Sequence, residues 1–330
     1  MRLLTAIILG LLLLVGVSAC GRGASSAAAA PTNPNEVRLV AFSPAIAVML
    51  RDLGYERQIV GRHAYDLVLD PSVPSVGDQG AIDYETLVRL HPTHVYTQFG
   101  EAGVPEHLRT LAAKHHWALE DYRLRTLDDI ATTLDDLALD LRGLPGLAPG
   151  ELDPAERFRG HEQPSARLAN AWADRGPTAR AAGRVLLLAP GSKPGVLGPG
   201  SVHQQLLVRM GATPAVTEGA SWIDLDAEDV VRLAPDAIIL FVTETSPANE
   251  DDRFVEPEPK GFEAAKARLG ALANLPIPAI QHKRVAVIEH PLALLPSSSL
   301  AEIADEMGKV FERWAAEDRA PTTPTTPTTP

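Results

Sequence analysis

The sequence predicts an α/β protein of two Rossmann-like lobes, each with a parallel sheet, joined by a helical backbone with a ligand cleft between them. Three observations support this. Short apolar runs alternate with helical stretches. One eleven-residue pattern occurs twice, 143 residues apart, and a single Gly- and Pro-containing connection separates the copies. Open parallel sheets bind ligands beyond the carboxyl ends of their strands, so two facing lobes share a cleft there.

The N-terminus carries the features of an export signal. Arg2 precedes an almost unbroken apolar run, Leu3 to Val17, which is short for a membrane-spanning helix. The next residues, Ser18-Ala19-Cys20, resemble the lipobox of bacterial lipoproteins, in which the cysteine is acylated. We therefore expect a signal peptide at 1–19 and a lipid on Cys20. Because the chain has one cysteine, it forms no intramolecular disulfide and no four-cysteine metal site.

Composition separates the folded body from two low-complexity segments. Residues 20–36 are rich in Ala, Ser, Gly and Pro and are expected to form a flexible tether. The Pro/Thr repeat within 318–330 is expected to stay extended and disordered. The net charge of −12 argues against nucleic acid as a partner. Between the two ends we expect an N-terminal lobe at 37–140, a connector at 141–183 and a C-terminal lobe at 184–317.

The predicted strands and helices follow from the apolar runs and their spacing. Strands are expected at Val37–Phe42, Gln58–Val60, His94–Phe99, Arg184–Ala189, Ala237–Val242 and Arg284–Glu289. Helices are expected at Ala45–Leu53, Pro105–Lys114, Thr126–Leu141, Val202–Met210 and Ser299–Ala316.

The repeated pattern defines the same unit in both halves. Residues 82–92 and 225–235 are identical at six of eleven positions. Each copy reads as a short helix with Asp83 or Asp226 as its N-cap and Pro92 or Pro235 as its stop, followed by a strand.

The sequence contains no motif typical of an enzyme. A nucleophile elbow, a phosphate-binding P-loop, a His-Glu-x-x-His pair and a dinucleotide-binding glycine pattern are all missing. His63, His203 and His290 fall in expected loops, but no two of them have the spacing of metal ligands. Several aromatic residues instead fall at or beyond strand ends and could line an apolar cleft, with core packing as the alternative for each: Phe42, Tyr65, Phe99, Trp222 and Phe241.

The order and spacing of short motifs resemble the ferric-siderophore and cobalamin class of periplasmic substrate-binding proteins of ABC importers, the class III type with a helical backbone. In the N-terminal half these are Arg38–Pro44, Val60–Asp66, Pro74–Asp78, Asp83-x-Glu85 and Leu90-x-Pro92; in the other half they are Arg184–Leu188, Gly198–Ser201, Leu206–Gly211, Asp226-x-Glu228, Leu233–Asp236 and Arg284–Ile288. The resemblance covers about residues 37 to 314. One departure concerns the connecting helix, in which Gly160 and Pro164 are expected to cause a kink or a shortening. The acidic, Pro-rich stretch 251–260 looks like an inserted surface loop.

The resemblance implies which residues contact the solute. They are Ser43, Pro44, Arg62, Tyr65, Gln79 and Phe99 in the first lobe and Ser192, Lys193, Trp222, Phe241 and His290 in the second. It also implies that an acidic residue on each lobe docks on permease arginines. Glu106 matches this position in the first lobe, and Glu244 and Glu250 are candidates in the second.

The expected function is that of a monomeric, non-enzymatic lipoprotein. It would capture a chelate outside the cytoplasmic membrane and deliver it to an ABC permease and its ATPase. The bound solute, which is not a resident cofactor, would be cobalamin or a ferric siderophore, with haem as the alternative. Only Arg62 in the predicted cleft loops offers an arginine to an anionic siderophore, whereas Tyr65, His63 or His290 could ligate haem iron. A chelatase-like cleft enzyme and a scaffold with an empty cleft remain alternative hypotheses.

Overall fold

The computed structural model describes residues 36–142, 144, 163–189, 195–243 and 261–319. The predicted export signal, Cys20 and the Pro/Thr repeat lie outside these residues. None of the described helices has the length and apolar character needed to cross a membrane.

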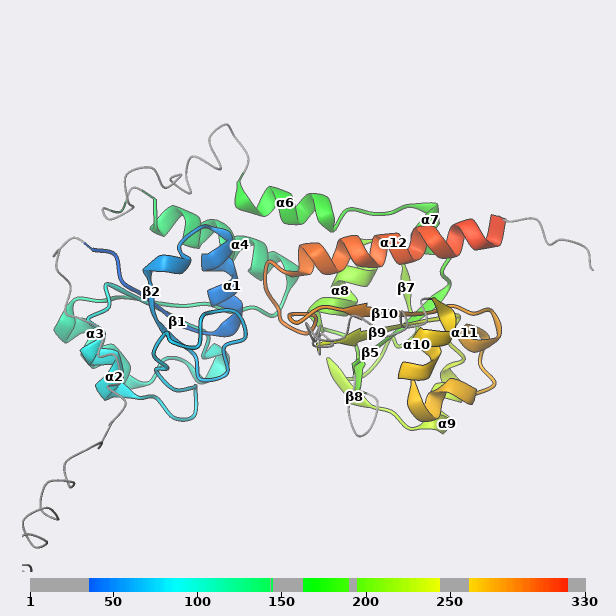
Figure 1. Cartoon of the computed structure of the whole chain (residues 1–330), viewed down its shortest axis with the longest axis horizontal. Helices are drawn as coiled ribbons and strands as arrows, with labels where there is room; N and C mark the ends of the chain where they lie inside the picture. Colours follow the sequence, from blue (N-terminus) through cyan, green and yellow to red (C-terminus); the bar gives the residue numbers. More distant parts are fainter. Residues whose placement is uncertain (1–35, 143, 145–162, 190–194, 244–260, 320–330) are drawn as a thin grey trace, which may run out of the picture.

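The chain forms two lobes that lie side by side, with helices along one side of both (Figure 1). The N-terminal lobe contains β1 (Leu39–Phe42), α1 (Pro44–Asp52), β2 (Ile59–Arg62), α2 (Tyr84–Arg89), β3 (His94–Thr97), α3 (Glu106–His115), β4 (Ala118–Asp121) and α4 (Leu127–Asp140). Between the lobes follow α6 (Pro164–Ala171) and α7 (Pro177–Arg180).

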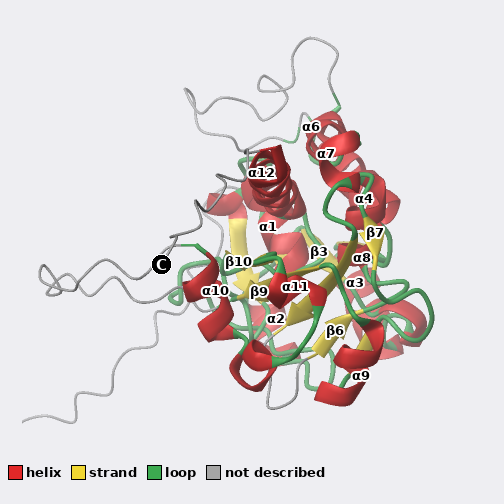
Figure 2. Cartoon of the chain, turned by 90° about the vertical axis from the view of Figure 1, so that its right-hand side faces the viewer, coloured by secondary structure: helices red, strands yellow, loops and turns green. Residues whose placement is uncertain are grey.

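The C-terminal lobe contains β5 (Arg184–Ala189), β6 (Gly195–Leu197), α8 (Val202–Arg209), β7 (Thr213–Pro214), β8 (Trp222–Asp224), α9 (Ala227–Leu233), β9 (Ala237–Val242), α10 (Phe262–Arg268), α11 (Pro278–Gln281), β10 (Val285–Glu289) and α12 (Leu300–Arg319). Short 3-10 turns lie at Glu56–Gln58, Gly100–Ala102 and Gly270–Asn274. Figure 2 shows α12 and α6 side by side above the strands.

Both sheets contain the predicted strands, and each has further strands that were not predicted, β4 in the first sheet and β6, β7 and β8 in the second. The first sheet has the order β2-β1-β3-β4 and is parallel throughout. The second has the order β10-β9-β5-β6-β8, with β7 beside β5, and its β6 pairs antiparallel with both β5 and β8. The predicted parallel pairing is therefore present among β10, β9, β5 and β7, and β6 and β8 extend the sheet with antiparallel pairs. The chain returns from β5 at Ala189 to β6 at Gly195, a connection too short for a parallel crossover.

The repeated pattern folds as predicted in both lobes. The Asp83 carboxylate accepts the N–H of Thr86 at the start of α2, and Asp226 accepts that of Asp229 at the start of α9. After each helix the chain enters a buried strand, β3 or β9. Pro164 begins the eight-residue helix α6, where its missing N–H costs nothing, so it starts a short helix and does not kink a longer one among the described residues. Gly160 lies outside the described residues.

One hydrophobic core passes through both lobes. Along β9 the alternate residues Ile238, Leu240 and Val242 face a local cluster of the C-terminal lobe, whereas Ala237, Ile239 and Phe241 face a larger shared cluster. In β1, Val40 and Phe42 face a local cluster of their own lobe, and Leu39 and Ala41 face the same shared cluster. This alternation follows from the two-residue period of a strand. Each sheet thus contributes one face to a common apolar layer.

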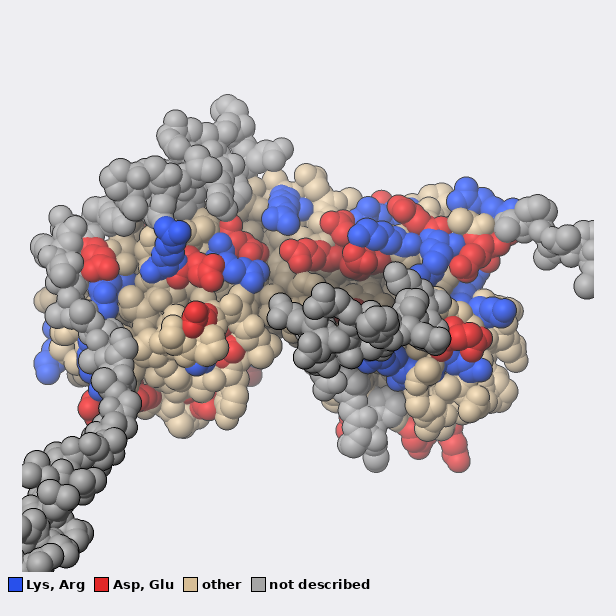
Figure 3. Space-filling view, viewed as in Figure 1, with Lys and Arg blue, Asp and Glu red and all other residues tan. Residues whose placement is uncertain are grey.

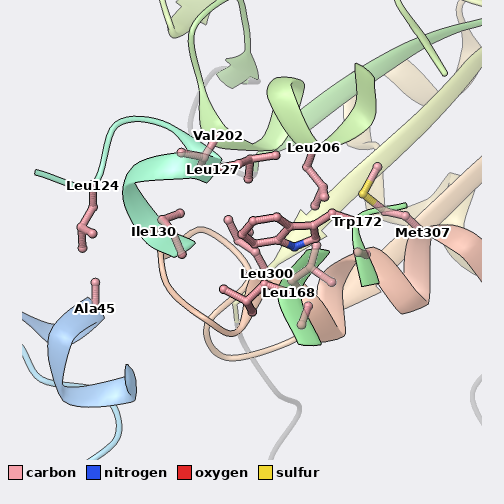
Figure 4. Packing of buried hydrophobic residues seen from close by; sticks show 14 of the residues in the cluster. Ala45, Leu124, Leu127, Ile130, Leu168, Trp172, Val202, Leu206, Leu300 and Met307 are labelled. Carbon is pink, nitrogen blue, oxygen red and sulfur yellow. The ribbon is translucent and has the colours of Figure 1, made fainter. Parts of the chain in front are cut away.

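Trp172 lies in this shared core between the lobes. Its side chain is surrounded by Leu127 and Ile130 of α4, Leu168 of α6, Val202 and Leu206 of α8, and Leu300 and Met307 of α12 (Figure 4). Only 1% of Trp172 is exposed, and the Arg209 guanidinium lies 5.7 Å from its ring centroid.

Polar contacts lock the same junction. The Gln205 side chain on α8 accepts the N–H of Leu127 at 3.2 Å and donates to the carbonyl of Arg125 at 3.1 Å. Arg209 pairs with Asp128 at 3.1 Å, and the Ser298 hydroxyl donates to Asp52 at 2.7 Å. Two separate segments of the second lobe therefore hold the first.

We expect Trp172→Ala to lower the free energy of unfolding by about 3–5 kcal/mol, because it removes a large side chain from a core that both lobes share. Urea denaturation followed by circular dichroism measures this loss. The control is Leu139→Ala on α4, whose side chain is 65% exposed and whose truncation should change stability by no more than about 0.5 kcal/mol. Equal effects of the two substitutions would contradict the central role of Trp172.

Candidate functional site

The carboxyl ends of β1, β2 and β3 bring several predicted residues together in the N-terminal lobe. The Ser43 hydroxyl, just after β1, donates to Gln98 Oε1 just after β3 at 2.6 Å. The ring of Phe42 stacks on Phe99 at 5.7 Å and meets the His63 ring edge-on at 6.1 Å. These contacts join three strand ends into one polar and aromatic cluster.

His63 holds the segment that carries Tyr65. Its ring is buried, with Nε2 2.9 Å from Gln79 Oε1. Nδ1 accepts the backbone N–H of Tyr65 at 3.1 Å, and the two rings lie 5.8 Å apart. With Nδ1 as acceptor, Nε2 carries the proton that is donated to Gln79. The Tyr65 side chain itself is 70% exposed.

Arg62 and Gly77 shape the loop after β2. The Arg62 guanidinium donates to three backbone carbonyls, those of His63, Pro71 and Val73. Gly77 has a φ of +91°, and a Cβ there would lie 2.0 Å from the Ala81 carbonyl oxygen, so only glycine fits. Asp78 accepts the N–H groups of Gly80 and Ala81 and places Gln79 at an exposed turn.

Three predicted contact residues, Ser43, Phe241 and Arg62, make contacts within the protein. Ser43 and Phe241 are fully buried, and the Phe241 ring packs 5.3 Å from that of His203. Phe42, grouped with the cleft aromatics, is fully buried as well. The Ser43 side chain caps α1 and donates to Gln98, and the Phe241 ring points into the shared core. Their contact with a solute stays a prediction. Arg62 is only partly exposed, and its guanidinium is occupied by the loop.

The remaining predicted residues are distributed over both lobes. Pro44 and Phe99 are partly exposed, and Gln79 is exposed. Glu106 at the start of α3 is exposed and pairs with Arg109 at 3.4 Å. Ser192, Lys193, Glu244 and Glu250 lie outside the described residues.

In the C-terminal lobe, Trp222 lies on the edge strand β8. Its side chain is 48% exposed, and its Nε1–H donates to Asp224 Oδ1 at 2.9 Å. It lines a cavity of about 600 Å³ together with Val216, Glu218, Gly219, Ala220, Ile223, Asp224, Leu225, Asp229, Arg232 and Leu233. That volume is in the range of small-molecule sites. Seen with all atoms, the molecule is hollowed between the lobes on the side away from α6 and α12 (Figure 3).

Two histidines fix the loop between β10 and α12. His290 Nε2 lies 2.9 Å from Glu302 Oε2, and its Nδ1 accepts the N–H of Leu292 at 3.1 Å. His203 on α8 is buried and bonds through Nε2 to the Ala293 carbonyl at 2.7 Å. The described residues also contain no group of three or more His, Cys, Asp or Glu side chains that could hold a metal ion.

Sequence reasoning missed Asp224, Gly195 and Asp121 as parts of this site. Asp121, at the end of β4, accepts the Thr97 hydroxyl and the Phe99 N–H, both at 2.8 Å. The spacing Trp222-x-Asp224 would have placed both side chains on one face, but only if a three-residue strand had been recognised there. The contact between Gly195 and Trp222 joins different strands, and no local pattern reveals it.

We expect His63→Leu to raise the hydrogen-exchange rate of the Tyr65 amide about tenfold, because that amide loses its acceptor, at a cost of about 1 kcal/mol. Exchange measured by NMR gives this rate directly. Gln79→Leu is the matched control, since it removes the partner of Nε2 and leaves Nδ1 in place. If both variants protect the Tyr65 amide as the parent does, His63 does not hold the segment.

The buried ring of His203 makes stability depend on pH. Burial lowers the pKa of His203, and the hydrogen bond to the Ala293 carbonyl only partly opposes this. The folded protein keeps the ring neutral while the unfolded chain takes up a proton below about pH 6.5. Stability contributed by this ring is therefore present above that pH and lost as the pH falls, by up to about 1.4 kcal/mol per unit.

The variant His203→Gln, whose amide can donate to the same carbonyl, is expected to show a smaller loss of stability between about pH 7 and about pH 5.5. Urea unfolding at the two pH values measures the difference. The same loss in the parent and the variant would show that His203 does not titrate in this way.

No family model and no curated protein matches the sequence. Among solved structures, the periplasmic heme-binding protein HutB of Vibrio cholerae aligns with a TM-score of 0.57 and 18% identity over 83% of this chain and 98% of its own. The periplasmic vitamin B12-binding protein BtuF of Vibrio cholerae aligns with a TM-score of 0.55 and 15% identity, over 84% and 97%. A periplasmic heme-binding protein of Pseudomonas aeruginosa gives 0.55 and 22%, over 84% and 92%.

These likenesses span nearly the whole of each solved protein and include both lobes. At 15–22% identity they establish the architecture. The chain therefore has the two-lobed fold of the periplasmic binding proteins, as the resemblance in its sequence implies.

Proposed function

We propose that this chain is the solute-binding component of an ABC importer and that it captures a metal tetrapyrrole, with haem favoured over cobalamin, between its lobes. The observation that carries the proposal is Tyr65. Its side chain is 70% exposed beyond the carboxyl ends of the parallel strands. A tyrosine oxygen is a known axial ligand of haem iron.

Competing ligands for the iron are already engaged. Both ring nitrogens of His63 and of His290 make hydrogen bonds within the protein. Within the described residues, the Tyr65 hydroxyl has no hydrogen bond to another group. Of the three side chains that could ligate haem by sequence, Tyr65 is the one whose donor atom is exposed and unoccupied.

The charges near Tyr65 give less support to an anionic siderophore. Arg62 is the arginine that the sequence offers for this purpose, and its guanidinium is hydrogen-bonded to three backbone carbonyls. An incoming carboxylate would have to compete with these bonds. A flat, largely apolar solute instead suits Tyr65 on one lobe and the half-exposed indole of Trp222 on the other. Similar folds have been solved as heme-binding and vitamin B12-binding proteins.

The proposal includes export, anchoring and delivery. The segment before Cys20 would direct the chain across the cytoplasmic membrane, and acyl chains on Cys20 would hold it there. A carboxylate at Glu106, whose side chain is 83% exposed, would meet arginines of the permease. Nothing in the described residues favours the alternative of a chelatase-like enzyme, since the histidines near the site are occupied by structural hydrogen bonds.

The test compares Tyr65→Phe and Tyr65→Ala with the parent, using ferric haem and cyanocobalamin as separate probes. We expect Tyr65→Phe to weaken haem binding by more than about tenfold, because one bond to the iron is lost, and to change the absorbance spectrum of bound haem. Cobalamin binding, if present, should tolerate phenylalanine, which keeps the ring, and should suffer in Tyr65→Ala.

Thermal unfolding in the presence of each solute provides an independent measurement. A solute at a hundredfold excess over its dissociation constant should stabilise the parent by about 2.7 kcal/mol. Unchanged haem affinity and spectrum in Tyr65→Phe would contradict the ligand assignment. A parent protein that neither haem nor cobalamin stabilises would contradict the proposed function.

A further inference from the structure

Trp222 differs from the other tryptophans of the chain in its exposure. Trp117, Trp172 and Trp314 are 8%, 1% and 1% exposed, whereas Trp222 is 48% exposed. An indole left half in water on an edge strand would ordinarily sample several rotamers. In this structure two neighbouring residues restrict the rotamers of the indole.

The first neighbour is Asp224, two residues further along β8. Side chains at this spacing lie on the same face of a strand. The Trp222 Nε1–H donates to Asp224 Oδ1 at 2.9 Å, and the carboxylate makes this a charge-assisted bond. It fixes the direction in which the indole points.

The second neighbour is Gly195 on β6, which pairs with Asp224, while Leu197 pairs with Trp222. The indole leans along the strands and covers Gly195. A Cβ added at this glycine would lie 2.0 Å from Trp222 Cζ2 and 2.4 Å from Cη2. No other residue type leaves room for the ring in its present place.

The backbone of Gly195 does not itself require glycine. Its φ lies outside the positive range that L-residues avoid, unlike that of eleven other glycines among the described residues. The missing side chain therefore serves the close approach of the indole, and the effect of an alanine can be assigned to that contact.

We infer that Gly195 and Asp224 are positioning residues for Trp222, which set the pose of the indole before a solute arrives. In that pose the indole forms part of the wall of the cavity of about 600 Å³ beside β8. A ring that is already in place loses less side-chain freedom when a flat solute packs on it, so affinity is higher. This inference rests on the proposed function in one respect, the contact between Trp222 and the solute.

The pose can be measured without any solute. Because the other three tryptophans are buried, acrylamide quenching of the intrinsic fluorescence reports mainly on Trp222. Gly195→Ala should displace the indole and increase its quenching. Asp224→Ala should do the same, and Asp224→Asn, which keeps an acceptor oxygen, should behave like the parent. Glu218→Gln is the control for loss of a nearby carboxylate, since Glu218 lines the same cavity and should leave the quenching unchanged.

Binding is then measured by titration with ferric haem and with cyanocobalamin. With the solute that the parent binds, we expect Gly195→Ala to lower affinity about tenfold, the order expected for one aromatic contact. The double variant Gly195→Ala/Trp222→Ala should bind no more weakly than Trp222→Ala alone, because the glycine acts through the indole. Circular dichroism and the urea midpoint show that each variant is folded.

The outcomes separate this inference from the proposed function. Unchanged quenching in folded Gly195→Ala overturns the positioning role. Increased quenching with unchanged affinity overturns it too. Additive losses in the double variant overturn it too, because they would show that Gly195 acts independently of Trp222. Failure of the parent to bind either solute contradicts the proposed function, while the quenching series still decides how the indole is held.

Discussion

The buried layer around Trp172 is the constraint on which the arrangement of the lobes depends. Helices α4, α6, α8 and α12 all contribute apolar side chains to it, and both sheets face it with alternate residues of their strands. Gln205, Arg209 and Ser298 add polar contacts across the same junction. Because interiors are close-packed and resist deformation, this layer fixes where the carboxyl ends of the two sheets lie relative to each other.

The residues at the strand ends then determine which side chains each lobe exposes. In the N-terminal lobe, the buried Ser43 and His63 and the partly exposed Asp121 form hydrogen bonds with neighbouring loops, and Tyr65 stays exposed. In the C-terminal lobe, Asp224 accepts a hydrogen bond from Trp222, and Gly195 lacks a side chain where the indole lies. Each lobe therefore holds an exposed aromatic residue in place through neighbouring groups, as binding sites require for defined geometry.

The sequence predicts elements whose cause is local and misses those whose cause is distant. The helices capped by Asp83 and Asp226 and the strands β5 and β9 follow from short patterns, and the structure confirms them. The three-residue strands β6 and β8 depend on partners elsewhere in the sheet, so no local periodicity predicts them. Likewise, the burial of Phe241 depends on which face of β9 meets the core. The hydrogen bonds of Arg62 depend on where the tertiary fold places the loop that supplies the three carbonyls.

The shared apolar layer also makes the two copies of the repeated unit depend on each other. Its two copies lie in different lobes, yet the strand that follows each copy turns one of its faces to the same core. A single half produced alone would leave that apolar face uncovered in water, and such a surface invites self-association. Each half therefore depends on the other to keep this face out of water.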